Sequence, residues 1–479
     1  MKNALEGLRK AYISLFASPY AIFSVGLVIL ILPYFFRGFA LHGQESYFFK
    51  RISEFILENN IPDYDFLSFG GRAFFYSMGA PLSLVIANLL FKINITNLLV
   101  FTPTIFGFLS LAFFYLILRH FNVKKNTLSF ACYMLVLSPP FLYSFTHFTS
   151  FTIPLFLNLL GFYFIINEKK KINHIAVAVY FLLTFFDAVH ILFGLLLSLF
   201  YFYKTKNLKR FIPYSFVLLF AMYLNNHFMK YGLDITNHRF YEYFFTFGGV
   251  YGLSIFLLFL SFFGLIWLWK RKYNNLIYYI FLISSLVILL LNIKYLVYFN
   301  MALCILGAYG LKYIYKFRWS STIIRNLTVM LLIGGILFSG VSFLIENFKQ
   351  DPSDELNDTL DYLEKKTSPR DVILTHEKYG MYINSISKRK NFVDFNKVYA
   401  PGSKLRFFYM EKVFHSRRLD ELLNLVRNNR VSYILITPEM KNGLVWNKDN
   451  EGLLYVIKKN PDYFNLVYDK DGYEIWRIL

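Results

Sequence analysis

The sequence predicts a polytopic α-helical membrane protein of about eleven spans, followed by a C-terminal α/β domain. Hydrophobic residues make up 56% and aromatic residues 21% of the 479 residues, more than an ordinary soluble protein carries. Apolar runs of about 20 residues, the length that crosses a hydrocarbon core, recur as far as residue 350. From residue 351 the charge becomes dense and mixed, and the apolar residues follow the periods of helices and strands. We therefore expect a transmembrane domain over 1–350 and a soluble domain over 351–479.

Eleven segments are apolar enough to be predicted as spans. The first is not followed by a small-residue cleavage site, so it is interpreted as an uncleaved helix and not as a signal peptide. Residues 80–91 are apolar but short, and we expect them to lie on the membrane or dip into it, inside a first outer loop over 38–98. The predicted spans are 19–37, 99–118, 127–143, 151–167, 174–187, 189–203, 211–228, 250–269, 276–292, 295–312 and 322–345.

The net charge of +20 belongs almost entirely to the membrane part. Residues 1–350 hold 29 Lys and Arg against 11 Asp and Glu, whereas residues 351–479 hold 21 against 19. Twenty of those 29 cations form clusters separated by enough apolar chain for two crossings, which is the positive-inside pattern. It predicts a cell-membrane protein with a cytoplasmic N-terminus and an extracytoplasmic C-terminal domain, and it argues against nucleic acid as a partner. The clusters lie at 2–10, 119–125, 169–171, 204–210, 270–272 and 312–325.

The first outer loop gathers the acids of the membrane part. Five of its 11 Asp and Glu residues fall between residues 41 and 72. Acids are rare in this part because most of it lies in lipid, so a polar loop that collects them is the expected place for chemistry. Lys50 and Arg51, on a predicted helix of this loop, are expected to be surface residues.

Residues 351–479 have the pattern of an α/β domain. Helices are predicted at 356–366, 419–428 and 453–459, strands at 371–375 and 431–437, and a hairpin over 464–477. This alternation favours a mostly parallel sheet with an antiparallel end. The domain has no glycine-rich phosphate loop, metal-spaced His/Cys set or nucleophile elbow. A structural or acceptor-docking role is the main interpretation, and a direct share in chemistry is the alternative.

The order of motifs resembles a known superfamily. One span is followed by GQESYFFKR, by IPDYDFLSFGGR, by TPTIFGFLSLAFFYLILRH, and by a basic turn and a span ending in LSPPFLYSF. This order is similar to that of the GT-C membrane glycosyltransferases, which use polyprenyl-phosphate sugars and include oligosaccharyltransferases and protein mannosyltransferases. The resemblance implies inverting transfer from a polyprenyl-phosphate-linked sugar, such as a dolichyl-phosphate sugar, to a protein, lipid or glycan acceptor on the outer face.

The resemblance assigns Glu45 to the acid of the first outer loop. In the family this acid acts as a base toward the acceptor or holds a divalent metal, so a Mg or Mn cofactor is an open expectation. A carboxylate just past a span is partly desolvated, a setting that suits a general base. The alternative is a solvated glutamate at the membrane interface.

Two basic residues are expected to bind the phosphate of the donor. Lys294 is the only charge at the turn between the ninth and tenth predicted spans, and it matches a family position that holds the lipid phosphate. Arg72 follows Gly70 and Gly71, which allow close backbone approach, and an arginine suits phosphate. The alternatives are a snorkelling lysine and an arginine that contacts lipid headgroups.

Five further residues are expected to line the site. Asp63 and Asp65 lie in the turn IPDYD and could equally be capping acids. Asp187 and His190 are three residues apart and can meet on one helical face, in the site or as a structural hydrogen bond. His147 lies where the family often has a second acid, and the missing acid weakens both a metal-dependent mechanism and an oligosaccharyltransferase proper. The acceptor channel could also be shaped by loop 229–249 through Asp234, His238, Arg239 and Glu242.

A transporter and a non-catalytic scaffold are the alternative functions. A transporter should have broken helices and ionisable residues at mid-membrane, whereas the charges here lie at predicted span ends. A non-catalytic scaffold of the same fold would explain the missing second acid.

Overall fold

The computed structural model of the protein describes residues 18–59, 61, 63–74, 76–167, 170–224, 244, 251–270, 273, 276–397, 400, 402–448 and 450–479. The chain forms two compact units that do not follow the order of the sequence. The helical unit comprises Met1–Ala40, Ser77–Ala80 and Asn97–Lys349, and the α/β unit comprises Leu41–Tyr76, Pro81–Thr96 and Gln350–Leu479. Most of the first predicted loop thus belongs to the same unit as the C-terminal domain.

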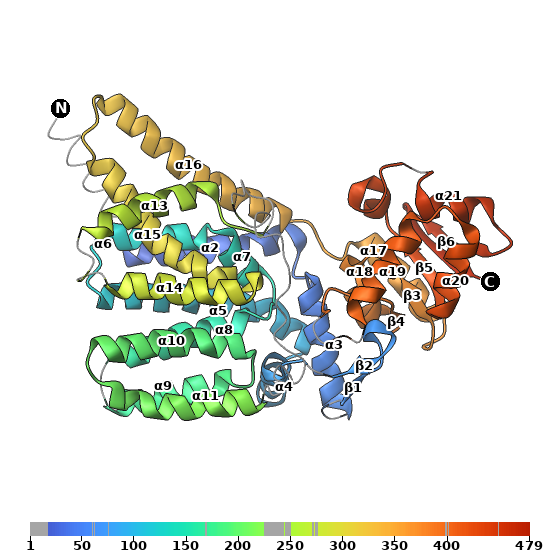
Figure 1. Cartoon of the computed structure of the whole chain (residues 1–479), viewed down its shortest axis with the longest axis horizontal. Coiled ribbons are helices and arrows are strands. Elements are labelled where there is room, and N and C mark those ends of the chain that lie inside the picture. The colour runs from blue at the N-terminus through green and yellow to red at the C-terminus, as the bar shows by residue number, and fades with distance from the viewer. Residues whose placement is uncertain are drawn as a thin grey trace. The chain divides into compact units, whose positions relative to one another are not determined.

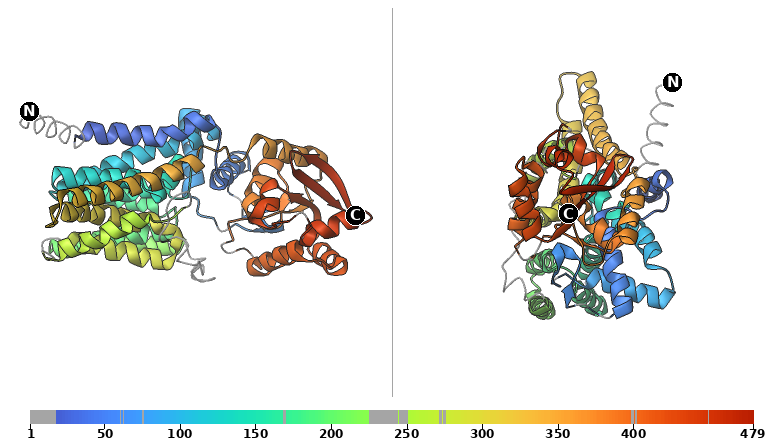
Figure 2. Two further views of the ribbon diagram at one scale, coloured as in Figure 1. Left: turned by 90° about the horizontal axis from the view of Figure 1, so that it is seen from above. Right: turned by 90° about the vertical axis from the view of Figure 1, so that its right-hand side faces the viewer.

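The helical unit consists of helices that lie side by side (Figures 1 and 2). Each of the eleven predicted spans coincides with a helix or with the pair α6 and α7, although residues 225–228 of the seventh span lie outside the described residues. The helices are α2 (Pro19–Arg37), α5 (Ile95–His120), α6 (Lys125–Val136), α7 (Pro139–Thr146), α8 (Thr152–Ile166), α9 (Lys170–Leu183), α10 (Ala188–Lys204), α11 (Ile212–Leu224), α13 (Ile255–Trp269), α14 (Leu276–Leu291), α15 (Leu296–Lys316) and α16 (Thr322–Glu346), with short 3-10 turns η2 (Leu208–Phe211) and η4 (Ile293–Tyr295).

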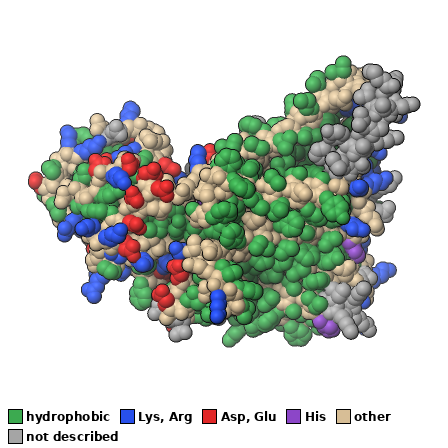
Figure 3. Space-filling view, turned by 180° about the vertical axis from the view of Figure 1, so that it is seen from behind, with side chains coloured by type: hydrophobic (Ala, Val, Ile, Leu, Met, Phe, Trp, Pro, Cys, Tyr) green, Lys and Arg blue, Asp and Glu red, His purple; other side chains and the backbone are tan. Residues whose placement is uncertain are grey.

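The lengths of these helices identify a multi-pass membrane protein. Four helices, α2, α5, α15 and α16, are long and apolar enough to cross a membrane, and a fifth span results if α6 and α7, bent by 61°, are counted together. Most of the remaining helices are apolar but shorter, with 10–17 residues. Figure 3 shows hydrophobic side chains covering the broad face of this unit, as a lipid-facing surface requires.

Small residues allow close helix packing in this unit. A Cβ atom added to Gly264 would lie 1.9 Å from the Leu306 carbonyl oxygen, and one added to Gly310 would lie 1.8 Å from that of Leu260. The backbones of α13 and α15 therefore touch directly, and Ser261 Oγ donates a hydrogen bond across the pair to the Leu303 carbonyl, 2.8 Å away. Glycine and serine at such crossings are the usual means of packing helices in lipid.

The α/β unit begins with the elements of the first predicted loop and continues with the C-terminal domain. The loop forms α3 (Gln44–Asn59), β1 (Tyr64–Asp65), η1 (Ser68–Gly70), β2 (Arg72–Ala73) and α4 (Gly79–Phe91). The C-terminal part forms α17 (Asp354–Lys366), β3 (Val372–Leu374), α18 (Glu377–Tyr382), the π-helical η5 (Ile383–Ser387), β4 (Lys390–Asn391), α19 (Ser403–His415), α20 (Leu419–Asn428), β5 (Val431–Ile436), η6 (Met440–Leu444), α21 (Gly452–Lys459), β6 (Phe464–Lys470) and β7 (Tyr473–Ile478).

The sheet is mixed, with the order β4-β3-β5-β7-β6. β3 pairs in parallel with β4 and β5, whereas β7 pairs antiparallel with β5 and β6. The prediction of a mostly parallel sheet overestimated the parallel share. Two of the four strand pairings are parallel and two are antiparallel, because β7 of the C-terminal hairpin pairs with both β5 and β6. The predicted helices and strands are confirmed, and the two-residue β4, η5 and α19 were missed because they lack a clear period of apolar residues.

Candidate functional site

Four of the predicted site residues lie in one group of contacts within the helical unit. This helix-end cluster consists of Tyr143, His147, Asp187, His190, Tyr251, Lys294 and Tyr295. The ring of Tyr143 lies 4.8 Å from that of His147 and 4.8 Å from that of Tyr251. The Tyr251 hydroxyl donates to the Lys294 carbonyl, 2.9 Å away, and the adjacent Tyr295 contacts both Asp187 and His190.

The side chains of Asp187 and His190 both contact Tyr295, and the His190 backbone N–H donates to the Asp187 carbonyl at 3.1 Å. Asp187 is the N-cap of α10: its carboxylate accepts the Val189 N–H at 3.1 Å and the Tyr295 hydroxyl at 2.6 Å. His190 is buried, with its Nδ1 2.7 Å from the Tyr298 hydroxyl and its ring 5.1 Å from that of Tyr295. Asp187 precedes the helix as its N-cap, so only His190 lies within α10.

Lys294 lies where several helices begin. It belongs to η4, directly before α15, and its backbone N–H donates to Asn292 Oδ1 at 3.0 Å. Phe151, the N-cap of α8, contacts His190 of α10 and Tyr295, the N-cap of α15, with ring separations of 5.4 and 5.6 Å. Helix N-termini carry partial positive charge and attract anions. Within the described part of the chain, no carboxylate pairs with Lys294 within 4 Å.

His147 is the C-cap of α7 and is buried. It lies next to a residue that the sequence did not single out, Arg37, the last residue of α2. The Arg37 guanidinium donates to the carbonyls of Thr146 and Asn347 and lies 4.7 Å from the Tyr34 ring centre. These carbonyls belong to the last residue of α7 and the C-cap of α16, whose partial negative charge balances the cation. Arg37 therefore has a structural explanation, and its place at the end of a span was the only signal for it.

Glu45 lies in the α/β unit, in the first turn of α3, and is half-buried. Asp63, further along the loop, is exposed, and its carbonyl accepts the Phe74 N–H at 3.0 Å. In the described residues no group of three or more His, Cys, Asp or Glu side chains is placed to hold a metal ion. No chemical step is assigned to a divalent cation. Asp234, His238, Arg239 and Glu242 lie outside the described residues.

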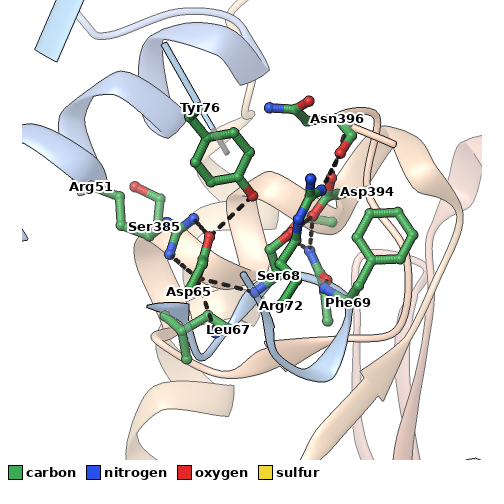
Figure 4. A network of polar contacts seen from close by, with 12 residues as sticks. Arg51, Asp65, Leu67, Ser68, Phe69, Arg72, Tyr76, Ser385, Asp394 and Asn396 are labelled. Atoms are coloured by element: carbon green, nitrogen blue, oxygen red, sulfur yellow. Dashed lines mark hydrogen bonds and ion pairs between the residues drawn. The ribbon is translucent and has the colours of Figure 1, made fainter. Parts of the chain in front are cut away.

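Asp65 forms a buried ion pair (Figure 4). Its two carboxylate oxygens lie 2.8 and 2.6 Å from the guanidinium of Arg51, and the backbone N–H groups of Leu67 and Ser68 also donate to it. Burial alone would raise the pKa of Asp65, but Arg51 and the two amides outweigh it and lower the pKa to about 2. Arg51 is therefore not the surface residue that was expected, because its partner lies 14 residues away in the chain.

Arg72 is also buried, with 1% of its surface exposed. Its Nη1 donates to the Asn396 carbonyl at 2.7 Å, and its guanidinium lies over the rings of Phe69 and Tyr76 (Figure 4). Gly71, at φ 125°, allows the Tyr64 ring to approach, since an added Cβ would lie 2.7 Å from the Tyr64 hydroxyl. In this structure Arg72 connects the first loop to the backbone of the C-terminal domain.

A second buried carboxylate completes this connection. Asp394 accepts hydrogen bonds from Ser68 Oγ at 2.7 Å and from Asn391 Nδ2 at 3.0 Å. Burial raises the pKa of Asp394 to about 6 in spite of these donors. Asn391 Oδ1 also accepts the N–H of Phe69, whose side chain is fully buried in the core of the C-terminal domain. Asp63 and Asp65 therefore have different environments: Asp63 is exposed, whereas Asp65 is buried and paired with Arg51.

Comparison with known structures identifies the fold. No family model matches the sequence, and no curated protein matches it by sequence. The archaeal oligosaccharyltransferase AglB from Archaeoglobus fulgidus, in complex with an inhibitory peptide and a dolichol-phosphate, superposes with a TM-score of 0.63 at 12% identity, over 96% of this chain and 74% of that chain. ArnT from Cupriavidus metallidurans in the apo state gives 0.53 at 11% identity over 98% of both chains.

The arabinofuranosyltransferase AftD from Mycobacteria gives a TM-score of 0.58 at 11% identity, over 98% of this chain and 40% of that chain. At these identities the likeness concerns the fold. The chain has the fold of the GT-C membrane glycosyltransferases that act with lipid-linked donors, which confirms the resemblance in its motif order.

Proposed function

We propose that this protein is an inverting membrane glycosyltransferase that moves a sugar from a polyprenyl-phosphate-linked donor to an acceptor at the extracytoplasmic face. The observation that carries the proposal is the helix-end cluster, in which Lys294 lies beside the N-termini of α8, α10 and α15. A similar fold, that of AglB, has been seen in complex with a dolichol-phosphate. A lysine beside helix N-termini in such a fold suits the phosphate of a lipid donor.

The proposed chemistry is a single displacement. The acceptor's nucleophilic atom forms a bond to the anomeric carbon as the bond from that carbon to the phosphate oxygen breaks. Glu45 takes the proton of the acceptor, and the polyprenyl phosphate leaves with the electron pair. Lys294 and the nearby helix N-termini stabilise the charge that develops on the phosphate, a large term in such reactions.

Lys294, and not Arg72, is the proposed ligand of this phosphate. Lys294 is half-exposed, and among the described residues it has no acidic partner. Arg72 is almost fully buried and already donates to the Asn396 carbonyl. Asp187, through Tyr295, and Tyr251, through its bond to the Lys294 carbonyl, keep the turn that carries Lys294 in place.

Eleven crossings with a cytoplasmic N-terminus and an extracytoplasmic C-terminal domain are part of the proposal. The geometry of the helical unit supports it, because α10 and α15 begin at the helix-end cluster and end in Lys204 and Lys316. Basic residues thus gather at the opposite end of these helices, as the positive-inside rule expects of the cytoplasmic side.

Transfer from a labelled donor tests the function. Purified protein in lipid nanodiscs is mixed with polyprenyl-phosphate carriers of radiolabelled glucose, mannose or N-acetylglucosamine and with an extract of the organism's envelope as acceptor. We expect release of polyprenyl phosphate and label in the acceptor fraction. Glu45→Gln should abolish transfer but keep donor binding, and Lys294→Gln should weaken donor binding at least tenfold.

The outcomes separate the rival functions. Full transfer by the Glu45→Gln variant would remove the proposed base. Donor binding without release by the wild-type protein would identify a non-catalytic scaffold, which the missing second acid allows. Uptake of a free sugar into sealed vesicles would identify a transporter.

A further inference from the structure

The C-terminal domain holds the helix that carries Glu45. α3 and residues 350–479 belong to one compact unit, although about 300 residues separate them in the chain. The Ser385 hydroxyl, in η5, donates to the Tyr47 carbonyl at 3.0 Å. The ring of Tyr47 also meets that of Tyr382 edge-on at 5.2 Å. Both contacts lie two residues from Glu45, in the first turns of α3.

The start of α3 is held by a third contact. Gly43 precedes the helix, and its N–H donates to the Asp351 carbonyl at 3.0 Å. Asp351 is the residue at which the composition of the chain changes, so the C-terminal domain contacts α3 from its own first residue onward. Gly43 adopts φ 81°, a conformation that favours glycine and lets the chain turn into the helix at this point.

A second connection binds α3 one turn beyond Tyr47. Arg51, two turns after Glu45, pairs with Asp65, and the segment after Asp65 is bound to the C-terminal domain. Phe69 contributes to this binding: its side chain is fully buried in the domain core and its ring lies 6.3 Å from that of Phe407. Phe69 has φ 52°, an unfavourable backbone conformation for a phenylalanine, which its burial and the Asn391 hydrogen bond maintain.

η5, which contacts α3, has further unusual features. It is a π-helical segment, a conformation frequent at functional sites. Asn384, directly before Ser385, is fully buried, and neither polar atom of its side chain has a hydrogen-bond partner among the described residues. An unsatisfied buried amide costs free energy.

We propose that the C-terminal domain positions Glu45 for catalysis, with Ser385 and Tyr382 as the positioning residues. This inference rests on the proposed function, in which Glu45 is the base. The domain contributes no catalytic residue of its own in this account. A reacting group must be held to within a fraction of an ångström, and small displacements reduce rates by up to about two orders of magnitude. A domain that binds α3 by two separate connections can supply that precision.

The test compares two Ser→Ala changes in full-length protein. Ser385→Ala, alone and with Tyr382→Leu, removes the contacts to Tyr47. Ser416→Ala is the matched control, because Ser416 is a buried serine of the same domain whose hydroxyl contacts Arg418 and Glu421. Steady-state transfer gives kcat and KM for the lipid donor, and amide hydrogen exchange is followed in peptides from residues 44–59.

We expect the double variant to lose at least tenfold in kcat, with less than a twofold change in KM for the donor and with faster exchange at residues 44–49. Ser416→Ala should match the wild type in kcat, in KM for the donor and in the exchange rate at residues 44–49. A double variant with wild-type kcat, or with unchanged exchange at residues 44–49, would overturn the positioning role. If wild-type protein transfers no sugar, the proposed function fails by itself, and the exchange measurement alone then decides whether the domain orders α3.

Discussion

The helical unit and the α/β unit deal with buried charge in different ways. In the α/β unit each buried cation near the first loop lies beside a carboxylate or a carbonyl: Arg51 pairs with Asp65, and Arg72 donates to Asn396. In the helical unit Arg37 has no carboxylate partner among the described residues and is balanced by the C-termini of α7 and α16. Lys294, which is half-exposed, has no carboxylate partner among the described residues and lies between the end of α14 at Leu291 and the start of α15 at Leu296.

This difference separates cations with partners inside the protein from Lys294, the proposed phosphate ligand. A buried charge with a matched partner is explained by folding alone. An anion that approaches from outside the protein, such as the phosphate of the proposed donor, would give Lys294 a partner of opposite charge. Lys294 is thus the cation that differs most from the buried and partnered cations of the α/β unit.

The largest expected effect is in the α/β unit. Asp65→Ala leaves the Arg51 guanidinium buried without its partner, so we expect a loss of about 3–5 kcal/mol in the stability of this unit. The measurement is the apparent melting temperature in detergent together with amide exchange in residues 41–76.

The control for this change is the double variant Arg51→Met/Asp65→Leu, which removes both charges. It should recover most of the lost stability, because no unpaired charge remains. Equal melting temperatures for Asp65→Ala and the wild type would show that the pair contributes nothing, and the contrast between the units would fail.

The second effect is a pH dependence of the α/β unit. Since the pKa of Asp394 is raised from 3.8 to about 6, the folded state binds this proton more tightly, and stability falls as pH rises from about 4 to 6, by at most about 3 kcal/mol. The pKa of Asp65 is lowered to about 2, so its contribution is complete above pH 4 and is lost as pH falls toward 2.

Asp394→Asn tests the first of these windows. The variant should show no decline in exchange protection of the C-terminal domain between pH 4 and 6, but should still lose protection below pH 4. A wild-type profile that is flat from pH 4 to 7 would contradict the raised pKa.

The third effect concerns the packing of the helical unit, which relies on backbone contact and not on charge. Gly264→Ala places a Cβ 1.9 Å from the Leu306 carbonyl oxygen, so α13 and α15 must separate. We expect a loss of about 1–3 kcal/mol, measured as a lower melting temperature. Gly334→Ala is the matched control: it lies in α16 with nothing within 4 Å, and it should be neutral or slightly stabilising.

The smallest effect sharpens the assignment of Lys294. Tyr295→Phe removes the hydrogen bond to Asp187, worth about 1 kcal/mol, and frees the turn that carries Lys294. We expect the KM for the lipid donor to rise about fivefold with little change in kcat. A fall in kcat at constant KM would instead place Tyr295 in the chemical step.

The periods of apolar residues were enough to locate most elements. The span predicted at 19–37 has the bounds of α2, and the helix predicted at 419–428 has those of α20. These segments have uninterrupted apolar length or a clear helical period, which depend only on neighbouring residues. The order of motifs also led to the correct fold, although no single motif was specific.

Less of the candidate site could be predicted from the sequence. The turn containing Lys294 and the pair Asp187 and His190 were singled out, but Tyr295 and Tyr251, which connect them, were not. Aromatic residues are so frequent in this chain that a single tyrosine carries no signal. Arg72 and Asp65 looked like site residues because they are charged and follow a span, yet the structure gives both of them partners within the protein.

The sequence by itself determined that this chain crosses a membrane, where its helices lie, which parts carry charge, and that a soluble α/β domain begins near residue 351. These properties follow from local composition, because the preference of each residue for lipid or water does not depend on residues far away in the sequence. Only the tertiary structure decided that the first loop folds with that domain and that Asp65 and Arg72 are internally paired. Those outcomes depend on contacts between residues up to about 300 positions apart, which no local pattern encodes.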